Sequence, residues 1–309
     1  MAVSRILDDA WRLQRLAPRS DPVHMVLDTD TYNEVDDQFA LAYALLSPEK
    51  LHVDAIYAAP FHNNRSTGPA DGMERSYNEI QRVLQLLGRT EAAPVFRGAP
   101  AFMAQTGAPV PSAAVDDLIA RGMAAREDEP LYVVAIGAIT NVASALLLEP
   151  RLVERIVVVW LGGHALDWPD TREFNLKQDV PAARALLDSG VPLVLLPCMG
   201  VTSHLLTTVA ELEAYVAGRS AVGDYLTEIV RGYHDEHRGW SKVIWDVAAI
   251  GYLLDAAWAP TFVTHSPVVT DQLTWSVDTS RHLIRVARWV DRDKIFTDLF
   301  DKLAKSGGR

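Results

Sequence analysis

Short apolar runs alternate with longer amphipathic stretches along most of this chain. Runs that are apolar throughout have the character of strands buried on both faces, and the amphipathic stretches between them have helical periodicity. The predicted strands are Val23–Leu27, Val53–Ala58, Tyr132–Ile136, Ile156–Trp160 and Pro192–Leu196. The predicted helices include Asp37–Leu46, Glu74–Leu87, Asn141–Leu148, Val180–Ser189, Val209–Ala217, Ala221–His234, Asp246–Leu254 and Arg292–Lys305. The pattern predicts an α/β fold with a mainly parallel central sheet and helices on both faces.

The alternation continues without a composition break, a long linker, an internal repeat or a low-complexity tract. We therefore predict a single domain over residues 23–309, with polar loops at Pro60–Gly72 and Gln105–Ser112. Residues 1–22 carry apolar side chains at helical spacing, which predicts an N-terminal helical extension packed on the domain. These apolar residues are Val3, Ile6, Ala10 and Leu13.

Composition narrows the class of protein. Of the 309 residues, 49% are hydrophobic and 22% are charged, which is enough for a packed core. The formal net charge of −11 argues against a partner that is a nucleic acid or an anionic membrane. The single cysteine, Cys198, excludes an intrachain disulfide and suits a reducing compartment. No apolar run is long enough to span a bilayer, and acidic residues occupy the place of a signal-peptide core, so we predict a cytoplasmic protein.

A cluster of acidic residues follows the first predicted strand directly, with five carboxylates within ten residues. Carboxylates that end a buried strand repel one another strongly, and a bound cation or protonation relieves the repulsion. Ligands of α/β proteins bind at this end of the strands. The stretch therefore predicts a site for a hard metal ion. The five residues are Asp28, Asp30, Glu34, Asp36 and Asp37.

Two other interpretations of this loop are open. Asp36 and Asp37 can simply begin a helix, because acidic side chains are favoured there, but that accounts for two carboxylates and not five. The spacing Asp28-x-Asp30-x-Thr also resembles the nucleophile loop of haloacid-dehalogenase-type phosphatases, in which Asp28 would attack phosphorus. That chemistry needs a distant lysine and a later acidic pair. Lys177 and Asp291–Asp293 are poor candidates for these by context.

Later motifs favour a different enzyme. Gly137-Ala-Ile-Thr-Asn141 follows the third predicted strand, Leu161-Gly-Gly163 follows the fourth, and Glu173-Phe-Asn175 comes shortly after. Trp245-Asp246 then precedes an apolar helix. In this order the motifs resemble the inosine–uridine preferring nucleoside hydrolase family over roughly residues 23–305. The resemblance implies that family's Rossmann-like fold and the hydrolysis of N-glycosidic bonds in ribonucleosides or related N-ribosides.

The resemblance also implies a Ca²⁺ site. Its protein ligands would be Asp30, Asp37, the backbone carbonyl of Thr140, and Asp246. Oxygen ligands of this kind are those that Ca²⁺ takes. Asp30 would in addition accept a proton from the water that attacks the anomeric carbon.

The same resemblance assigns the ribose contacts. Asp36 would accept from the 2′-hydroxyl, while Glu173 and Asn175 would bind the 3′ and 5′ side of the sugar. Some of these residues also have structural interpretations, since Asn175 and Asp246 are each placed where a residue can cap a helix. His164 and His204 are expected to be structural histidines.

This chain departs from the family pattern in its acidic loop, which is two residues longer than the Asp-x-Asp-Pro-Gly-x-Asp-Asp of its relatives. We expect residues of the segment Tyr32–Glu34 to reach the pocket. Pro60 stands where many members have a ribose-contacting asparagine, and Asn63 or Asn64 is the expected substitute.

A second departure concerns the leaving group. Trp245 stands where purine-tolerant members have a histidine that helps to protonate the base. An indole cannot act as that acid but can stack on a base, so Trp245 is a predicted substrate contact. His237, on the helix expected to close the pocket, is the candidate acid. The aglycone stays open, and a riboside-binding protein without catalysis is a third interpretation. A homodimer or homotetramer is expected, as in relatives.

Overall fold

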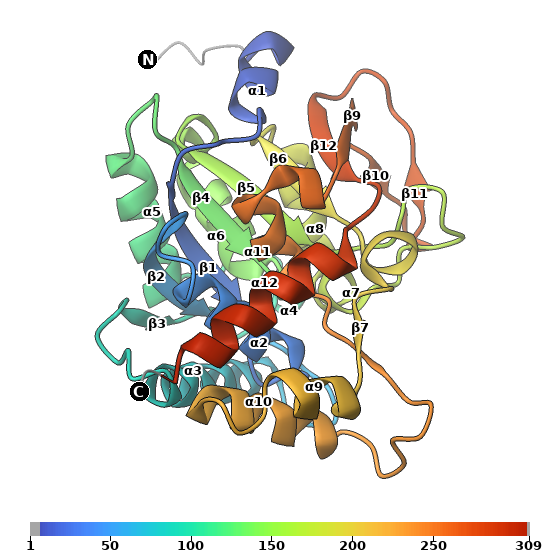
Figure 1. Cartoon of the computed structure of the whole chain (residues 1–309). Helices are drawn as coiled ribbons and strands as arrows, with labels where there is room; N and C mark the ends of the chain where they lie inside the picture. Colours follow the sequence, from blue (N-terminus) through green and yellow to red (C-terminus); the bar gives the residue numbers. More distant parts are fainter. Residues whose placement is uncertain (1–6, 308–309) are drawn as a thin grey trace.

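An eight-stranded sheet forms the centre of the computed structural model, which describes residues 7–307 (Figure 1). The strand order in space is β3-β2-β1-β4-β5-β6-β12-β9. The strands are β1 (Val23–Thr29), β2 (Leu51–Ala58), β3 (Val95–Arg97), β4 (Leu131–Ala135), β5 (Ile156–Leu161), β6 (Leu193–Leu196), β9 (Thr261–His265) and β12 (Leu283–Ala287). Two small antiparallel sheets lie outside it, formed by β7 (Leu206–Thr207) with β8 (Lys242–Val243) and by β10 (Val268–Val269) with β11 (Trp275–Ser276).

Helices pack on both faces of this sheet. None of the helices in the described part of the chain is long and apolar enough to cross a membrane. They are α1 (Asp9–Arg15), α2 (Asp36–Leu45), α3 (Pro69–Leu86), α4 (Met103–Thr106), α5 (Ala113–Ala124), α6 (Thr140–Leu148), α7 (Phe174–Gln178), α8 (Val180–Asp188), α9 (Val209–Tyr215), α10 (Ala221–Arg231), α11 (Val247–Leu254) and α12 (Arg292–Lys305). Shorter helical turns are η1 (Pro150–Glu154), η2 (Cys198–Thr202) and η3 (Ala256–Trp258).

Alternation along the strands creates two cores, because successive side chains of a strand point to opposite faces. In β1, Met25 and Leu27 join the core under α2, α3, α11 and α12, whereas Val26 joins the core under α5, α6 and α8. Figure 1 shows α11 and α12 crossing in front of the sheet. α2 is buried along its whole length, so the acidic residues that begin it are held rigidly in the interior.

The strand order reverses at β1, which pairs in parallel with β2 on one side and with β4 on the other. In open α/β sheets, ligands bind at the carboxyl ends of the strands where the order reverses. The acidic loop after β1 and the Gly137–Asn141 turn after β4 therefore meet at the topological switch point.

The predicted mainly parallel α/β fold is confirmed, and each of the five predicted strands is present with ends displaced by no more than two residues. The short strand β3 and the edge pair of β12 with the antiparallel β9 were not predicted. No residue of β9 is fully buried and two of its five are exposed, so its sequence lacks the apolar run on which the prediction relied. The helix α5 was also missed, and the predicted loop Gln105–Ser112 contains the end of α4.

Residues 1–22 include the helix α1, although its buried face differs from the predicted one. Ala10 is exposed, whereas Arg12 and Leu16 are buried. Arg12 Nε donates to the Gly190 carbonyl over 3.0 Å, which attaches the helix to the domain. The amphipathic pattern was misread because a buried arginine supplies part of the packing face. Val3 and Ile6, which completed the predicted face, lie outside the described residues.

Candidate active site

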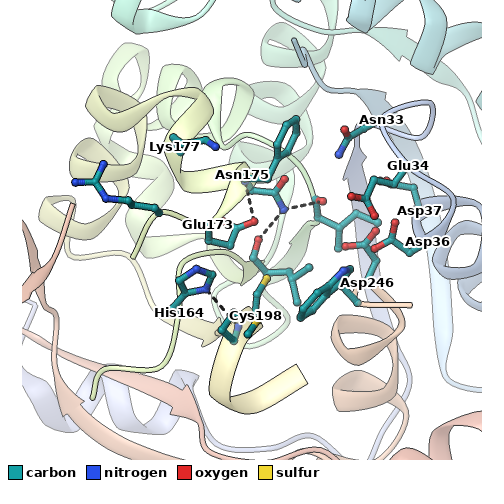
Figure 2. Close-up of a pocket in the computed structure, with 16 residues that line it drawn as sticks. Asn33, Glu34, Asp36, Asp37, His164, Glu173, Asn175, Lys177, Cys198 and Asp246 are labelled. Atoms are coloured by element: carbon teal, nitrogen blue, oxygen red, sulfur yellow. Dashed lines mark hydrogen bonds between the residues drawn. The ribbon is translucent and has the colours of Figure 1, made fainter. Parts of the chain in front are cut away.

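A pocket of about 260 Å³ opens at the carboxyl end of the sheet (Figure 2). Residues that follow four neighbouring strands line it: the acidic loop after β1, Ile136 after β4, His164 and Glu173 after β5, and Cys198 after β6. Trp245 and Asp246, which precede α11, complete the wall. The topology thus brings together segments that are more than 200 residues apart in the sequence.

Three buried carboxylates form one wall of this pocket. Asp36, Asp37 and Asp246 each offer an oxygen, and these three oxygens lie within 4.8 Å of one another. Asp246 is the residue directly before α11, but its side chain makes no capping hydrogen bond. Its interpretation as a helix cap is therefore not supported, and the side chain joins the acidic cluster instead.

Asp30 lies beside this cluster and is completely buried. Neither of its carboxylate oxygens has a hydrogen-bond partner among the described residues. Burial, followed by the charges of Asp37 and Asp36, raises the pKa of Asp30 well above its usual range. A Cβ at Gly137 would lie 3.1 Å from the Asp30 carboxyl carbon, so the glycine after β4 leaves room for this side chain.

The electrostatics of the cluster fit a divalent cation. Burial, followed by Asp36, raises the pKa of Asp37 to about 8, and burial raises the pKa of Asp36 to about 6. Burial, followed by Asp36 and Asp37, also raises the pKa of Asp246. Carboxylates in this condition must be protonated or neutralised by a positive charge. With unpartnered oxygens on Asp30 beside them, the donor set consists of hard oxygen ligands, which fits Ca²⁺.

Thr140, the fourth predicted metal ligand, is buried at the start of α6. Its hydroxyl donates to Asp179 Oδ2 over 2.7 Å, and Asp179 also accepts from the backbone N–H of Met103 and Ala104. This network fixes the turn after β4. The role of the Thr140 carbonyl as a metal ligand stays a prediction.

Asp28 lies behind the pocket. It has no exposed surface, and its Oδ1 accepts from Asn141 Nδ2 over 2.7 Å. Asn141 in turn accepts from the Ala99 N–H through its Oδ1, which fixes the orientation of its amide. Burial raises the pKa of Asp28 to about 7. Asp28 therefore supports the loop from the interior of the fold.

The opposite wall carries Glu173 and Asn175, both predicted sugar contacts (Figure 2). Glu173 caps α7 by accepting from the N–H groups of Asn175 and Leu176, and it also accepts from Gly163 N over 2.9 Å. Gly163 has φ +70°, which a glycine adopts without strain. Asn175 Nδ2 donates to the carbonyls of Ile136 and Leu161, so this side chain joins two strand ends and does not cap a helix.

Two residues of the longer acidic loop, Asn33 and Glu34, line the pocket as expected, whereas Tyr32 packs against Arg65, 4.5 Å from its guanidinium carbon. Asn63, the proposed substitute for the missing ribose contact, donates from Nδ2 to Asn33 Oδ1 over 2.7 Å. Glu34 forms an ion pair with the buried Lys242 on β8.

The expected position of His237 on the closing helix is wrong, because α10 ends at Arg231 and Gly232 begins a loop. His237 Nε2 hydrogen-bonds the Arg231 carbonyl over 2.9 Å, and its ring packs 5.8 Å from Trp240. Its role as an acid stays a prediction. Trp245 does line the pocket, so the leaving-group side has an indole wall.

The two histidines that were expected to be structural differ in position. His204 stacks on Trp289 at 4.0 Å, and its Nε2 contacts the Val290 carbonyl, which fits a structural role. His164, by contrast, lines the pocket, and its Nδ1 accepts from Met199 N–H over 3.3 Å.

Sequence reasoning missed several further lining residues. Cys198 follows β6, and the general rule that strand ends carry the site would have drawn attention to it. Arg172 and Phe174 adjoin the predicted Glu173, and Met199 follows Cys198, so their neighbours were the available signal. Lys177 also lines the pocket, and nothing in the sequence around it marks it as a lining residue.

Several known proteins are similar to this chain. The family model for inosine-uridine preferring nucleoside hydrolases matches residues 25–297. The pyrimidine-specific ribonucleoside hydrolase RihA of Escherichia coli O81 (strain ED1a) is 29% identical over 260 residues, which cover 74% of this chain and 79% of that protein. RihA of Escherichia coli O7:K1 (strain IAI39 / ExPEC) is 30% identical over 261 residues, with the same shares covered.

Solved structures share the fold. The plant nucleoside hydrolase PpNRh1 superposes with a TM-score of 0.73 at 22% identity, over 92% of this chain and 99% of that chain. A purine-preferring ribonucleoside hydrolase from Gardnerella vaginalis gives the same values. The names of these similar proteins include both pyrimidine-specific and purine-preferring enzymes, so the likeness does not select a base.

Proposed function

Because the chain belongs to the inosine-uridine preferring nucleoside hydrolase family, we propose that it hydrolyses the N-glycosidic bond of ribonucleosides or related N-ribosides. The products are ribose and the free base. The observation that carries the proposal is the buried group of Asp36, Asp37 and Asp246, with Asp30 and its unpartnered oxygens beside it. This group lies at the topological switch point, where such a fold binds its ligand.

Asp30, Asp37, Asp246 and the Thr140 carbonyl would hold Ca²⁺. When bound, the ion would offset the negative charge of the carboxylates. It would also orient the ribose diol and lower the pKa of a nearby water molecule. Asp36 would accept from the 2′-hydroxyl at the same wall of the pocket. Asn175 would present its Oδ1 to the sugar, because its Nδ2 is already used by two carbonyls.

Asp30 would act as the base. Its buried carboxylate has no other hydrogen-bond partner among the described residues, so it is free to accept a proton from the attacking water. The water oxygen then bonds to the anomeric carbon while the C–N bond breaks, and the electron pair of that bond leaves with the base, which takes up a proton from solvent to give the free base. The sugar passes through an oxocarbenium-like state.

The phosphatase interpretation is disfavoured by geometry. Asp28 and Asp30 are both fully buried, but Asp28 Oδ1 already accepts a hydrogen bond from Asn141, whereas neither oxygen of Asp30 has a partner among the described residues. Phosphate release from a phosphomonoester, or an acyl-phosphate trapped on Asp28, would support that interpretation instead.

The test is a screen of ribonucleosides for liberated ribose, with and without a calcium chelator. We expect turnover that the chelator abolishes. Asp30→Ala should lose turnover and bind Ca²⁺ more weakly, whereas Asp293→Ala, at an 89% exposed side chain, should behave as the wild type. Full hydrolysis by the Asp30→Ala protein would contradict the proposal.

The same screen addresses the non-catalytic interpretation, which the indole at Trp245 keeps open. A riboside-binding protein would be protected by ribose against thermal unfolding and would release base from no riboside. If ribose protects the protein against thermal unfolding but no base is released from any riboside at any pH tested, the function of this pocket is binding and not hydrolysis.

A further inference from the structure

The longer acidic loop places an amide donor in the pocket with a fixed orientation. Arg65 N–H donates to Asn63 Oδ1 over 2.8 Å, so Asn63 presents its Nδ2. Asn63 Nδ2 donates to Asn33 Oδ1 over 2.7 Å. The remaining Nδ2 of Asn33, a residue only 8% exposed, is therefore available to a ligand. Figure 2 shows this nitrogen on the pocket side of the Asn33 amide, with the oxygen turned away.

The neighbouring Glu34 adds an acceptor. Its Oε2 pairs with the Lys242 ammonium group, which also lies 4.9 Å from the ring of Tyr233. The Glu34 carbonyl accepts from Arg65 Nη1 over 2.8 Å, so both the backbone and the side chain are held. A carboxylate that is ion-paired through one oxygen still offers acceptor oxygens, so Glu34 can accept a hydrogen bond from a ligand.

The position of this pair relative to the sugar site indicates what it contacts. Asp36, Asp37 and Asp246 are almost completely buried, whereas the Glu34 side chain is 34% exposed and Trp245 is half-buried. A ribose whose diol lies on the buried carboxylates directs its aglycone outward, towards the half-buried Glu34 and Trp245 and past the adjoining, more deeply buried Asn33. Asn33 and Glu34 then lie beside the base.

We propose that Asn33 and Glu34 recognise the aglycone. Asn33 Nδ2 donates to a carbonyl oxygen or ring nitrogen of the base, and Glu34 accepts from an N–H group next to it. Uracil and cytosine both offer this pairing. Since the base leaves with the electron pair of the broken bond, its acceptor atoms become more negative, and a fixed donor binds them more tightly in the transition state. This inference rests on the proposed function.

The experiment compares two kinds of riboside with the Asn33→Ala protein. Uridine and cytidine carry the donor–acceptor pair, whereas the leaving group of 4-nitrophenyl β-D-ribofuranoside has no N–H and departs as a stable anion. We expect kcat/KM for both nucleosides to fall at least about tenfold, and kcat/KM for the nitrophenyl riboside to change less than about threefold.

Further variants separate recognition from folding. Asn63→Ala, which removes the positioning residue and leaves Asn33 in place, should give the same selective loss in weaker form. Glu34→Gln should also be selective for nucleosides. Asn64→Ala is the matched control, because Asn64, the other residue expected to replace the missing ribose contact, is exposed on the same loop as Asn63 and does not line the pocket. Thermal unfolding of each protein shows that it is folded.

The outcomes are distinct. Parallel losses on nucleosides and on the nitrophenyl riboside would mean that Asn33 acts on the sugar or on the fold, and would overturn the inference. No loss in any variant would overturn it as well. A wild-type protein that releases ribose from no ribonucleoside, purine nucleosides included, would refute the proposed function itself. That result is seen before any variant is made.

Discussion

Replacing Asp246 by Asn should stabilise the metal-free protein and remove its response to calcium. Asp246 offers an oxygen within 4.8 Å of oxygens of both Asp36 and Asp37. At an effective dielectric constant of about 20, each like-charge pair at this separation costs about 3 kcal/mol. The pKa of Asp37 is raised to about 8, so protonation already removes part of this repulsion in the wild type. We therefore expect the substitution to raise the free energy of unfolding of the metal-free protein by only ~1–3 kcal/mol.

The assay is thermal unfolding with chelator and with excess Ca²⁺. For a domain of about 300 residues, each kcal/mol corresponds to a shift in Tm of about 1.5–2 °C. The wild type should gain about 2.7 kcal/mol at a calcium concentration one hundred times Kd, whereas Asp246→Asn should gain little. Asp293→Asn, at an 89% exposed side chain, is the control and should match the wild type.

Two results would refute this reasoning. One is a metal-free Asp246→Asn protein that is less stable than the metal-free wild type, since like-charge repulsion could not then dominate the cluster. The other is a wild type whose Tm is the same in chelator and in calcium, since the carboxylates would then hold no ion.

Three further predictions concern other positions. Gly137→Ala should weaken Ca²⁺ binding and turnover while the fold is retained, because its Cβ would lie 3.1 Å from the Asp30 carboxyl carbon; Gly68→Ala, where nothing lies within 4 Å, is the control for calcium titration. Tyr43→Phe should lower the free energy of unfolding by about 1 kcal/mol without changing kcat, because the hydroxyl donates to Asp298 Oδ2 over 2.7 Å far from the pocket. Burial, followed by the nearby Arg12 and Arg281, lowers the pKa of His282 to about 4. The free energy of unfolding should therefore fall as the pH drops from about 6.5 towards 4. His282→Gln should flatten this dependence on pH, measured by denaturant titrations. An unchanged slope would show that His282 is not protonated on unfolding in this range.

The parallel strands could be predicted because each is buried on both faces and must be apolar throughout. β1, β4 and β5 are runs of this kind, and their ends were predicted to within two residues. β9 escaped prediction because an edge strand needs apolar residues only where it is covered, and none of its residues is fully buried. The face of α1 was misread for a related reason, since the aliphatic part of a buried arginine can pack like an apolar side chain.

The sequence by itself determined the family and the chemical type of the site, because five carboxylates in ten residues and the motifs that follow each strand are local features. Only the tertiary structure decided which groups meet. Asp246 joins Asp36 and Asp37, Lys242 neutralises Glu34, and Asn63 turns the amide of Asn33 towards the pocket. These contacts depend on how α11, β8 and the loop after β2 pack around the end of β1. Hydrogen-bond direction and charge pairing are properties of that packing, and no spacing along the chain encodes them.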